Sequence, residues 1–417
     1  MFRSIATAYR EAFSGLSRPV WLLSIATLVN RSGTMVMPFL ALFLTEKRGF
    51  TTTQAGQTLA LYGLGAMGAS YLGGWLCDRI SPMRVMKWSL AATGICFMTL
   101  GHLQGRLAIS AMMLVLSFVG EIFRPANLAA LVAASDPGER GRSFALMRLA
   151  VNLGMTLGPT LGGFLALRDY GLLFVADGAT CLLAAGLLQI AFPGAGLRTV
   201  PRSAETRAKA AAASPWRDRP VLGILGLMFL LNVVTFQLNG TFPLTLRHLH
   251  GLSEARIGLA LATNTILIVL FEMVLVHSLS SRNPLKVSGV GAFLFCAGLG
   301  LLPLGRGFGF VVFTVAVWTV GEMLVFPIVS SAVADRAPQE SQGAYMGLLN
   351  LSFASAFVVA PLVGTWVYQN LGPTTLWYGC GAVGLVVWAG FQGLAALASR
   401  PARAGTSPAP ATLEDGL

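Results

Sequence analysis

Long apolar runs, separated by short polar or Gly- and Pro-containing stretches, recur along the whole chain. A helix of about 20 apolar residues is long enough to cross a bilayer, so we predict an all-α polytopic membrane protein with twelve spans. Their expected ranges are 17–44, 52–77, 82–103, 107–134, 142–168, 171–192, 219–247, 252–279, 284–304, 308–334, 342–369 and 374–397. Residues 193–218 form the one long polar stretch. We interpret them as a cytoplasmic linker between two six-helix bundles, 1–192 and 219–398, followed by a flexible cytoplasmic tail at 399–417.

Composition supports a membrane protein. The chain is 55% hydrophobic and 11% charged, with a mean hydropathy of +0.70, whereas soluble domains contain roughly 25% charged residues. A transmembrane barrel is excluded, because its strands alternate over segments of about ten residues. The five cysteines have no metal-ligand or disulfide-framework spacing, and no cofactor or metal is expected.

The net charge of +12 reflects basic residues that gather on alternate loops. Because cytoplasmic loops carry the excess of Lys and Arg, this bias places both termini in the cytoplasm of a bacterial-type inner membrane. It explains the charge better than nucleic-acid binding, so no nucleic-acid partner is expected.

The two halves repeat each other. "VGE" occurs at 119–121 and again at 320–322, and Asn30 in the first span corresponds to Asn232 in the seventh. Two parallel repeats around a site at the membrane midplane are typical of transporters. We therefore expect a monomer in the lipid bilayer that takes a small-molecule substrate.

The loop after the second span, "GGWLCDRISPMR", contains Gly74, Asp78 and Arg79, with Arg84 as a further basic residue. It resembles the signature loop of the major facilitator superfamily. The resemblance implies the major facilitator fold, with two pseudo-symmetric six-helix halves. It also implies a gating contact in which Asp78 holds the halves together on one side of the membrane. The alternative is a charged loop that only sets topology.

The fifth span contains "GMTLGPTLGG", with small or kink-forming residues at Gly154, Gly158, Pro159, Gly162 and Gly163. This pattern resembles the motif of twelve-span drug:proton antiporters in that superfamily. Glycines at this spacing allow close helix packing, and a proline kinks the helix. Generic glycine-mediated packing is the alternative interpretation.

The resemblance implies that the first, fourth, seventh and tenth spans line a central cavity. Arg31, Glu121, Arg124 and Glu322 lie near the middle of three of these spans, so we expect them to converge there. Charge at the bilayer centre is costly and usually functional. We predict that the glutamates bind and release protons, and that Arg124, three residues after Glu121, tunes its proton affinity. A structural ion pair is the alternative.

Other polar residues in the spans are further candidates. Glu272 is a further proton-coupling candidate, balanced against a structural role. Substrate-binding candidates are Asn30, Arg31, Thr34, Asn232, Gln237 and Asn239, although polar contacts between helices would use the same residue types. Asp177 is predicted to be structural, Arg148 to extend to the membrane interface, and His248 and His250 to be solvated.

These patterns favour proton-coupled export of small amphipathic or cationic compounds by alternating access. The alternative within transport is proton-coupled uptake of a nutrient such as a peptide, sugar or organic acid. A non-transporting sensor on the same fold would not need charged residues at the midplane. An enzyme is disfavoured, because the sequence contains no nucleophile–base set, metal cluster or phosphate loop.

Overall fold

A computed structural model describes residues 14–136, 138–194, 215–279, 281–338 and 341–398. These residues are nearly all helical, with no strand among them. The elements are α2 (Arg18–Ser32), α3 (Val36–Leu42), a π-helical turn (Phe43–Lys47), α4 (Thr52–Arg79), α5 (Pro82–His102), α6 (Arg106–Glu121), α7 (Phe123–Ala134), α8 (Arg140–Ala166), α9 (Gly171–Ala191), the 3₁₀ turn Pro215–Arg217, α11 (Arg219–Thr235), the 3₁₀ turn Phe236–Asn239, α12 (Thr241–His248), α13 (Glu254–Ser278), α14 (Pro284–Gly300), the 3₁₀ turn Leu302–Leu304, α15 (Gly307–Arg336), α16 (Gln342–Leu371) and α17 (Pro373–Ala398).

Within the described residues, ten helical segments are long and apolar enough to cross a membrane. They confirm a multi-pass helical membrane protein. The helices α4 and α5 are not among the ten. Helix α4 contains Gly, Thr and Gln where other spans have Leu and Val. Helix α5 contains the charged residues Arg84 and Lys87.

Three of the predicted spans are broken helices rather than continuous ones. The breaks precede Pro38, Pro125 and Pro243. A proline has no N–H to donate to the carbonyl four residues earlier, which weakens the helix one turn before it. The breaks therefore fall beside the candidate site residues Thr34, Glu121 and Asn239.

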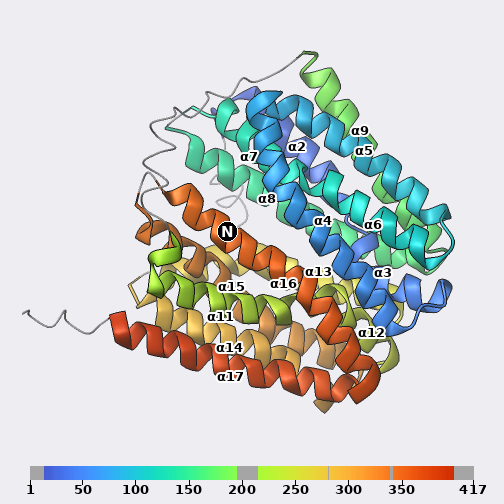
Figure 1. Cartoon of the computed structure of the whole chain (residues 1–417), viewed down its shortest axis with the longest axis vertical. Coiled ribbons are helices and arrows are strands. Elements are labelled where there is room, and N and C mark those ends of the chain that lie inside the picture. The colour runs from blue at the N-terminus through green and yellow to red at the C-terminus, as the bar shows by residue number, and fades with distance from the viewer. Residues whose placement is uncertain (1–13, 137, 195–214, 280, 339–340, 399–417) are drawn as a thin grey trace, which may run out of the picture.

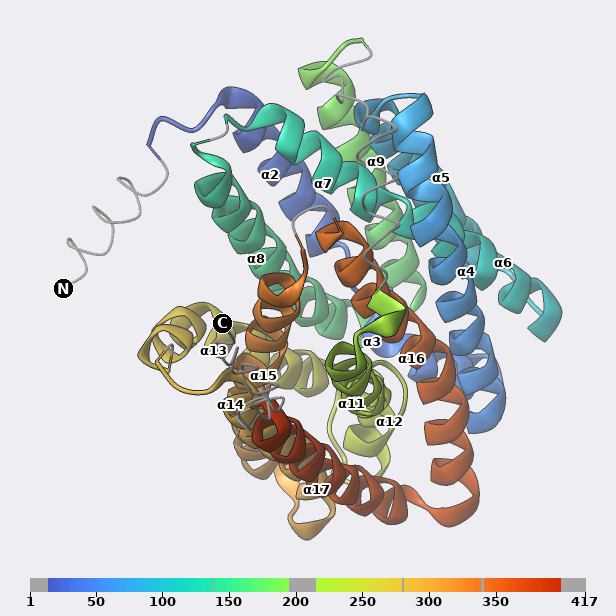
Figure 2. The ribbon, with the colours of Figure 1, turned by 60° about the vertical axis from the view of Figure 1, so that its left-hand side comes forward.

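The helices form two groups that pack against each other. Helices α2 to α9 lie together, and α11 to α17 lie together (Figures 1 and 2). The groups meet where α4 packs against α16 and where α8 packs against α13. Candidate residues on α2, α7 and α8 line cavities to which both groups contribute. The predicted linker and tail lie mostly outside the described residues.

Candidate functional site

A cavity of about 500 Å³ lies between the two groups of helices. We call it the wide cavity. Its charged lining comes from the N-terminal group, with Arg31, Glu121 and Arg124. Asn239 and Phe357 supply lining from the C-terminal group. The structure thus brings together three of the four midplane charged residues that the sequence singled out.

Glu121 is the last residue of α6, at the break before Pro125. Its carboxylate accepts a hydrogen bond of 2.9 Å from the Tyr62 hydroxyl on α4. The other carboxylate oxygen lies 3.4 Å from Nε of Arg124, so the ion pair expected from their spacing is present. Since 59% of the Arg124 side chain is exposed, against 19% for Glu121, the arginine can move away from the pair without a large rearrangement.

Arg31 lies in the last turn of α2, next to the break in the first span. Its guanidinium lies 6.0 Å from the centre of the Phe123 ring, and it lines the wide cavity. Thr34 lines the same cavity and donates to the Arg31 carbonyl. Asn30 donates to the sulfur of Cys181 at 3.4 Å. The Arg31 guanidinium is therefore available to a solute, whereas the Thr34 hydroxyl and the Asn30 amide already have protein partners.

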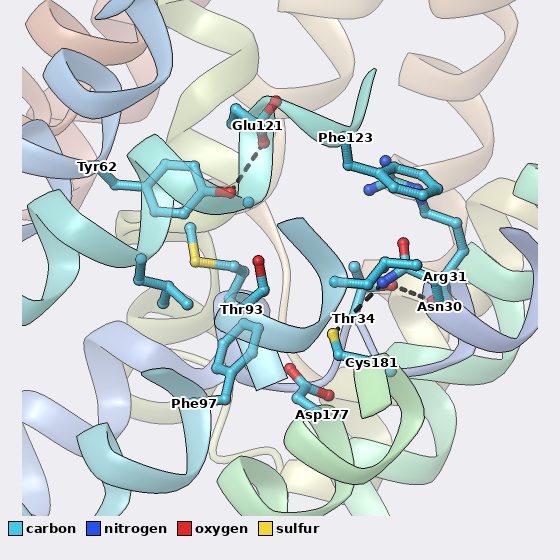
Figure 3. Close-up of a pocket in the computed structure, with 15 residues that line it drawn as sticks. Asn30, Arg31, Thr34, Tyr62, Thr93, Phe97, Glu121, Phe123, Asp177 and Cys181 are labelled. Carbon is cyan, nitrogen blue, oxygen red and sulfur yellow. Dashed lines mark hydrogen bonds between the residues drawn. The ribbon is translucent and has the colours of Figure 1, made fainter. Parts of the chain in front are cut away.

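Asp177 on α9 stabilises the break in the first span. Its carboxylate accepts hydrogen bonds from the backbone N–H groups of Met35, at 3.0 and 3.2 Å, and of Val36, at 2.9 Å. These are the orphan donors at the start of α3, and the side chain is completely buried. Figure 3 shows Asp177 beneath Arg31 and Thr34. This geometry supports the structural role predicted for Asp177.

The glycines of the fifth span form close contacts on two faces of α8. Gly154 and Gly158 pack against α2 and its break, where a Cβ at 154 would lie 2.4 Å from Cβ of Arg31. Gly163 packs across the interface, where a Cβ would lie 2.5 Å from the carbonyl oxygen of Glu254 on α13. The close packing expected from the motif is present, and it positions Arg31 and joins the two groups of helices.

We predict that Gly158→Leu loses transport and stability. A Cβ at this position would lie 2.9 Å from Oγ1 of Thr34 and 3.1 Å from its carbonyl oxygen, and overpacking of this kind costs about 1–3 kcal/mol. Gly186→Leu in α9 is the control, because a Cβ there has no neighbour within 4 Å. The measurements are melting temperature in detergent and transport in liposomes. A Gly158→Leu protein that matches the control in both would contradict the packing argument.

Glu322 does not join the other midplane charges. It lines a separate cavity of about 450 Å³, the acidic cavity, with Glu272 and Arg148. Asn264 on α13 donates to its carboxylate at 2.7 Å, which turns the side chain toward α13 and away from Arg31. The expectation that all four midplane charges converge was therefore wrong for Glu322.

Arg148 does not extend to the membrane interface as predicted. It reaches from α8 to Glu272 on α13 and forms an ion pair between the two groups of helices. Glu272 is buried, so this pair fixes one of the two carboxylates of the acidic cavity. Glu322 keeps a neutral partner only, among the described residues.

The remaining candidates are placed less favourably for binding a solute. The Gln237 amide donates to the carbonyls of Val233 and Ala360 and accepts from Thr241, so it serves helix packing. Asn232 is buried in α11. Arg79 lies over the Trp75 ring at 4.4 Å, and Arg84 is exposed. The surroundings of Gly74 and the side chain of Asp78 lie outside the described residues.

A polar network missed by the sequence analysis joins the two groups at the face formed by loops 48–51, 103–105, 167–170 and 249–253, which we call the predicted outer face. Arg247 lies 3.4 Å from Glu46 and 3.7 Å from Glu254. His248 lies 3.9 Å from Glu46 and Tyr170 donates to Glu254 at 3.1 Å. Opposite charges at the ends of neighbouring spans were the only signal in the sequence.

Burial shifts the pKa values of two side chains at the predicted outer face, Tyr170 and His250. Burial, with a further contribution from Glu254, raises the pKa of Tyr170 well above its usual value, so the phenol remains a donor. Burial also lowers the pKa of His250, and nearby Arg306 adds to the effect. His250 is buried, whereas His248 is exposed and contacts Glu46 and Tyr368. The prediction that the histidines are solvated was therefore wrong for His250.

Arg247→Gln is predicted to loosen closure at the predicted outer face. It removes the Arg247–Glu46 pair, which joins the two groups. Because an exposed pair contributes up to about 1 kcal/mol, opening there should increase by a few-fold. The measurement is labelling of Met37→Cys, in a cysteine-free background, by an impermeant thiol reagent added at that face. Arg306→Gln is the control, since Arg306 contacts the carbonyl of Leu249 in its own group. Equal labelling in the two variants would contradict this role.

Comparison with known proteins identifies the class. Residues 21–361 match the family model of the Major Facilitator Superfamily, so the chain belongs to this superfamily of transporters. The match confirms the resemblance and a transport protein rather than an enzyme. It covers the spans that form both the wide and the acidic cavities.

The relatives include transporters of different substrates. The chain is 25% identical over 372 residues to the multidrug resistance protein MdtH of Yersinia pestis, covering 85% of this chain and 89% of the relative. It is 24% identical over 389 residues to the Na⁺, Li⁺, K⁺/H⁺ antiporter of Planococcus maritimus, covering 85% and 88%. A solved POT family transporter in complex with 5-aminolevulinic acid shares the fold, with a TM-score of 0.78 at 16% identity, covering 93% and 98%.

Proposed function

We propose that this protein is a proton-coupled exporter of small amphipathic or cationic compounds. The observation that carries the proposal is Glu121, a carboxyl at a helix break that lines the wide cavity and has two exchangeable partners, Tyr62 and Arg124. Proton binding weakens the pair with Arg124, and proton release restores it. A group that changes partners in this way can link protonation to the arrangement of the cavity.

The acidic cavity favours a cationic substrate. With Glu272 paired to Arg148, Glu322 provides one unpaired negative charge when ionised, beside the apolar side chains of Met323 and Phe326. A hydrophobic cation would gain both electrostatic attraction and apolar contact there. The names of the multidrug resistance and cation/H⁺ antiporter relatives agree with this class of substrate.

The proposed architecture is twelve spans in two six-helix bundles, residues 1–192 and 219–398, with both termini in the cytoplasm of a bacterial inner membrane. We propose that the protein works as a monomer. The Arg247–Glu46 ion pair, the hydrogen bond from Tyr170 to Glu254 and the glycine contacts of α8 with α13 join the two groups at the predicted outer face, which favours assignment of this structure to an inward-facing state. In the outward-facing state, Asp78, Arg79 and Arg84 would hold the cytoplasmic ends together, with Gly74 allowing close approach.

A second candidate function is uptake of a zwitterionic nutrient. The wide cavity contains Arg31 and Arg124 against Glu121, whereas the acidic cavity contains Glu322 and Glu272 against Arg148. A solute with a carboxylate at one end and an amine at the other would match this dipolar arrangement. The structural likeness to a POT family transporter holding 5-aminolevulinic acid motivates the comparison.

Transport into inverted membrane vesicles tests both candidates. Hydrophobic cations would be added outside the vesicles, and zwitterionic peptides and amino acids would be loaded inside them, with an imposed gradient, acidic inside. Export predicts accumulation of cations that stops when a protonophore dissipates the gradient. Gradient-dependent movement of zwitterions alone would replace the first proposal with the second. No protonophore-sensitive transport of either panel would contradict both.

A further inference from the structure

A narrow second cavity, which we call the inner cavity, extends from the proposed proton site into the N-terminal helices. Its volume is about 70 Å³. It shares Arg31, Tyr62 and Glu121 with the wide cavity and ends at Asp177 and Cys181 on α9. One polar space thus touches both the carboxyl at the break before Pro125 and the carboxyl that stabilises the start of α3.

A buried hydroxyl without a partner lies on the wall of this cavity. Thr93 on α5 is only 8% exposed, and its Oγ1 has no hydrogen-bond partner among the described residues. In Figure 3, Thr93 lies between Glu121 and Asp177. A buried hydroxyl left unpaired costs about 1–3 kcal/mol, so a ligand with both donor and acceptor capacity would be stabilised there.

We propose that the inner cavity is a water site that transfers protons between Glu121 and Asp177. Because a water molecule occupies about 30 Å³ in the liquid, the cavity has room for about two. Its polar lining provides the two to four partners that a buried water needs. This inference rests on the proposed proton coupling through Glu121 and adds a second, internal carrier of the proton.

The transfer conserves atoms and charge. Protonated Glu121 gives its proton to the first water, that water gives a proton onward, and the last water protonates the Asp177 carboxylate. Glu121 becomes ionised and can pair with Arg124, while Asp177 becomes neutral. The charged or titratable groups around the path are Arg31, Tyr62 and the thiol of Cys181.

The transfer would change the first span. Ionised Asp177 accepts three hydrogen bonds from the backbone of Met35 and Val36. Bonds to an ionised acceptor are roughly twice as strong as those to a neutral one. Neutral Asp177 therefore holds the start of α3 less tightly. Since Arg31 and Thr34 flank this break, a proton on Asp177 would alter the wall of the wide cavity.

Radiolytic hydroxyl-radical labelling tests the water site directly, because radicals form from bound water inside a protein. Cys181 is 2% exposed and lines the inner cavity, whereas Cys296 is fully buried where α14 packs against α17 at Gly384. We expect Cys181 to be oxidised at least about tenfold faster than Cys296 if it touches buried water. Equal protection of the two thiols would overturn the proposal. This readout does not depend on transport, so it separates failure of the water site from failure of the proposed function.

Two variants test the proton path. Thr93→Val keeps the shape and removes the hydroxyl, so it should slow gradient-driven transport and Cys181 labelling by several-fold, whereas Thr93→Ser should resemble wild type.

Asp177→Asn keeps an acceptor for the start of α3 but cannot take a proton, so the transport rate should depend less on the size of the proton gradient. Wild-type labelling and gradient-driven rates in Thr93→Val, or wild-type gradient dependence in folded Asp177→Asn, would overturn the proposal. Counterflow exchange would establish that the variants still transport.

Discussion

Glu121→Gln is expected to abolish gradient-driven transport while the protein remains folded. Glutamine cannot release a proton, but its carbonyl can still accept the hydrogen bond from Tyr62 that Glu121 accepts at 2.9 Å. The variant leaves Arg124 without its partner. Because 59% of that side chain is exposed in the structure, the pair should behave more like an exposed than a buried one, and the stability cost should be about 1 kcal/mol. Transport assays in liposomes and melting temperatures give the two values.

The double variant with Arg124→Leu separates the two effects of Glu121→Gln. Arg124→Leu removes the arginine that lost its carboxylate partner, so some of the lost stability should return. Gradient-driven transport should stay absent, because no titratable group is restored. Glu139→Gln is a matched control, since Glu139 also pairs with an arginine three residues later, at 3.6 Å, but lies at the start of α8. Full gradient-driven transport by Glu121→Gln would exclude Glu121 as the coupling residue.

Glu322→Gln is expected to separate transport from the proton gradient. Glutamine imitates the protonated carboxyl, can keep the contact with Asn264 and leaves the Arg148–Glu272 pair intact. Substrate exchange should therefore continue, while accumulation against a gradient should fail. Affinity for cations should fall as well, since the acidic cavity loses its unpaired negative charge.

Ser330→Ala is the control for Glu322→Gln. Ser330 lines the same cavity, carries no charge and donates to the carbonyl of Phe326 in its own helix. Gradient-driven accumulation by this control and not by Glu322→Gln would support the assignment. If both proteins accumulate substrate normally, Glu322 has no part in coupling.

The sequence predicted the helices well because each span must be apolar over a long range. The apolar runs located the helices, with ends close to those of the structure in most cases. The prolines at 38, 125 and 243 did not by themselves predict the breaks, because Pro159, Pro327 and Pro361 lie inside continuous helices. The break before Pro38 also depends on Asp177, which is more than 130 residues away and binds the freed N–H groups.

Site partners were less predictable than site residues. The pair of Glu121 with Arg124 followed from their spacing on one helix. Tyr62 and Asn264 bind the two glutamates from other helices, and a single sequence contains no information on which residues of two packed helices face each other. For the same reason, the contact of Arg148 with Glu272 was missed. Glu322 was assigned to the wrong cavity because depth in the membrane fixes a height along the helix but not a direction.

Substrate-induced proton movement tests the central claim most directly. Purified protein would be placed in liposomes that contain a pH-sensitive dye, with no imposed gradient, and a cation transported in the vesicle assay would be added outside. A proton-coupled exporter predicts proton movement opposite to the cation in the wild type, and none in the Glu121→Gln, Glu322→Gln double variant. Cation uptake by the wild type without any proton movement would contradict the proposed coupling.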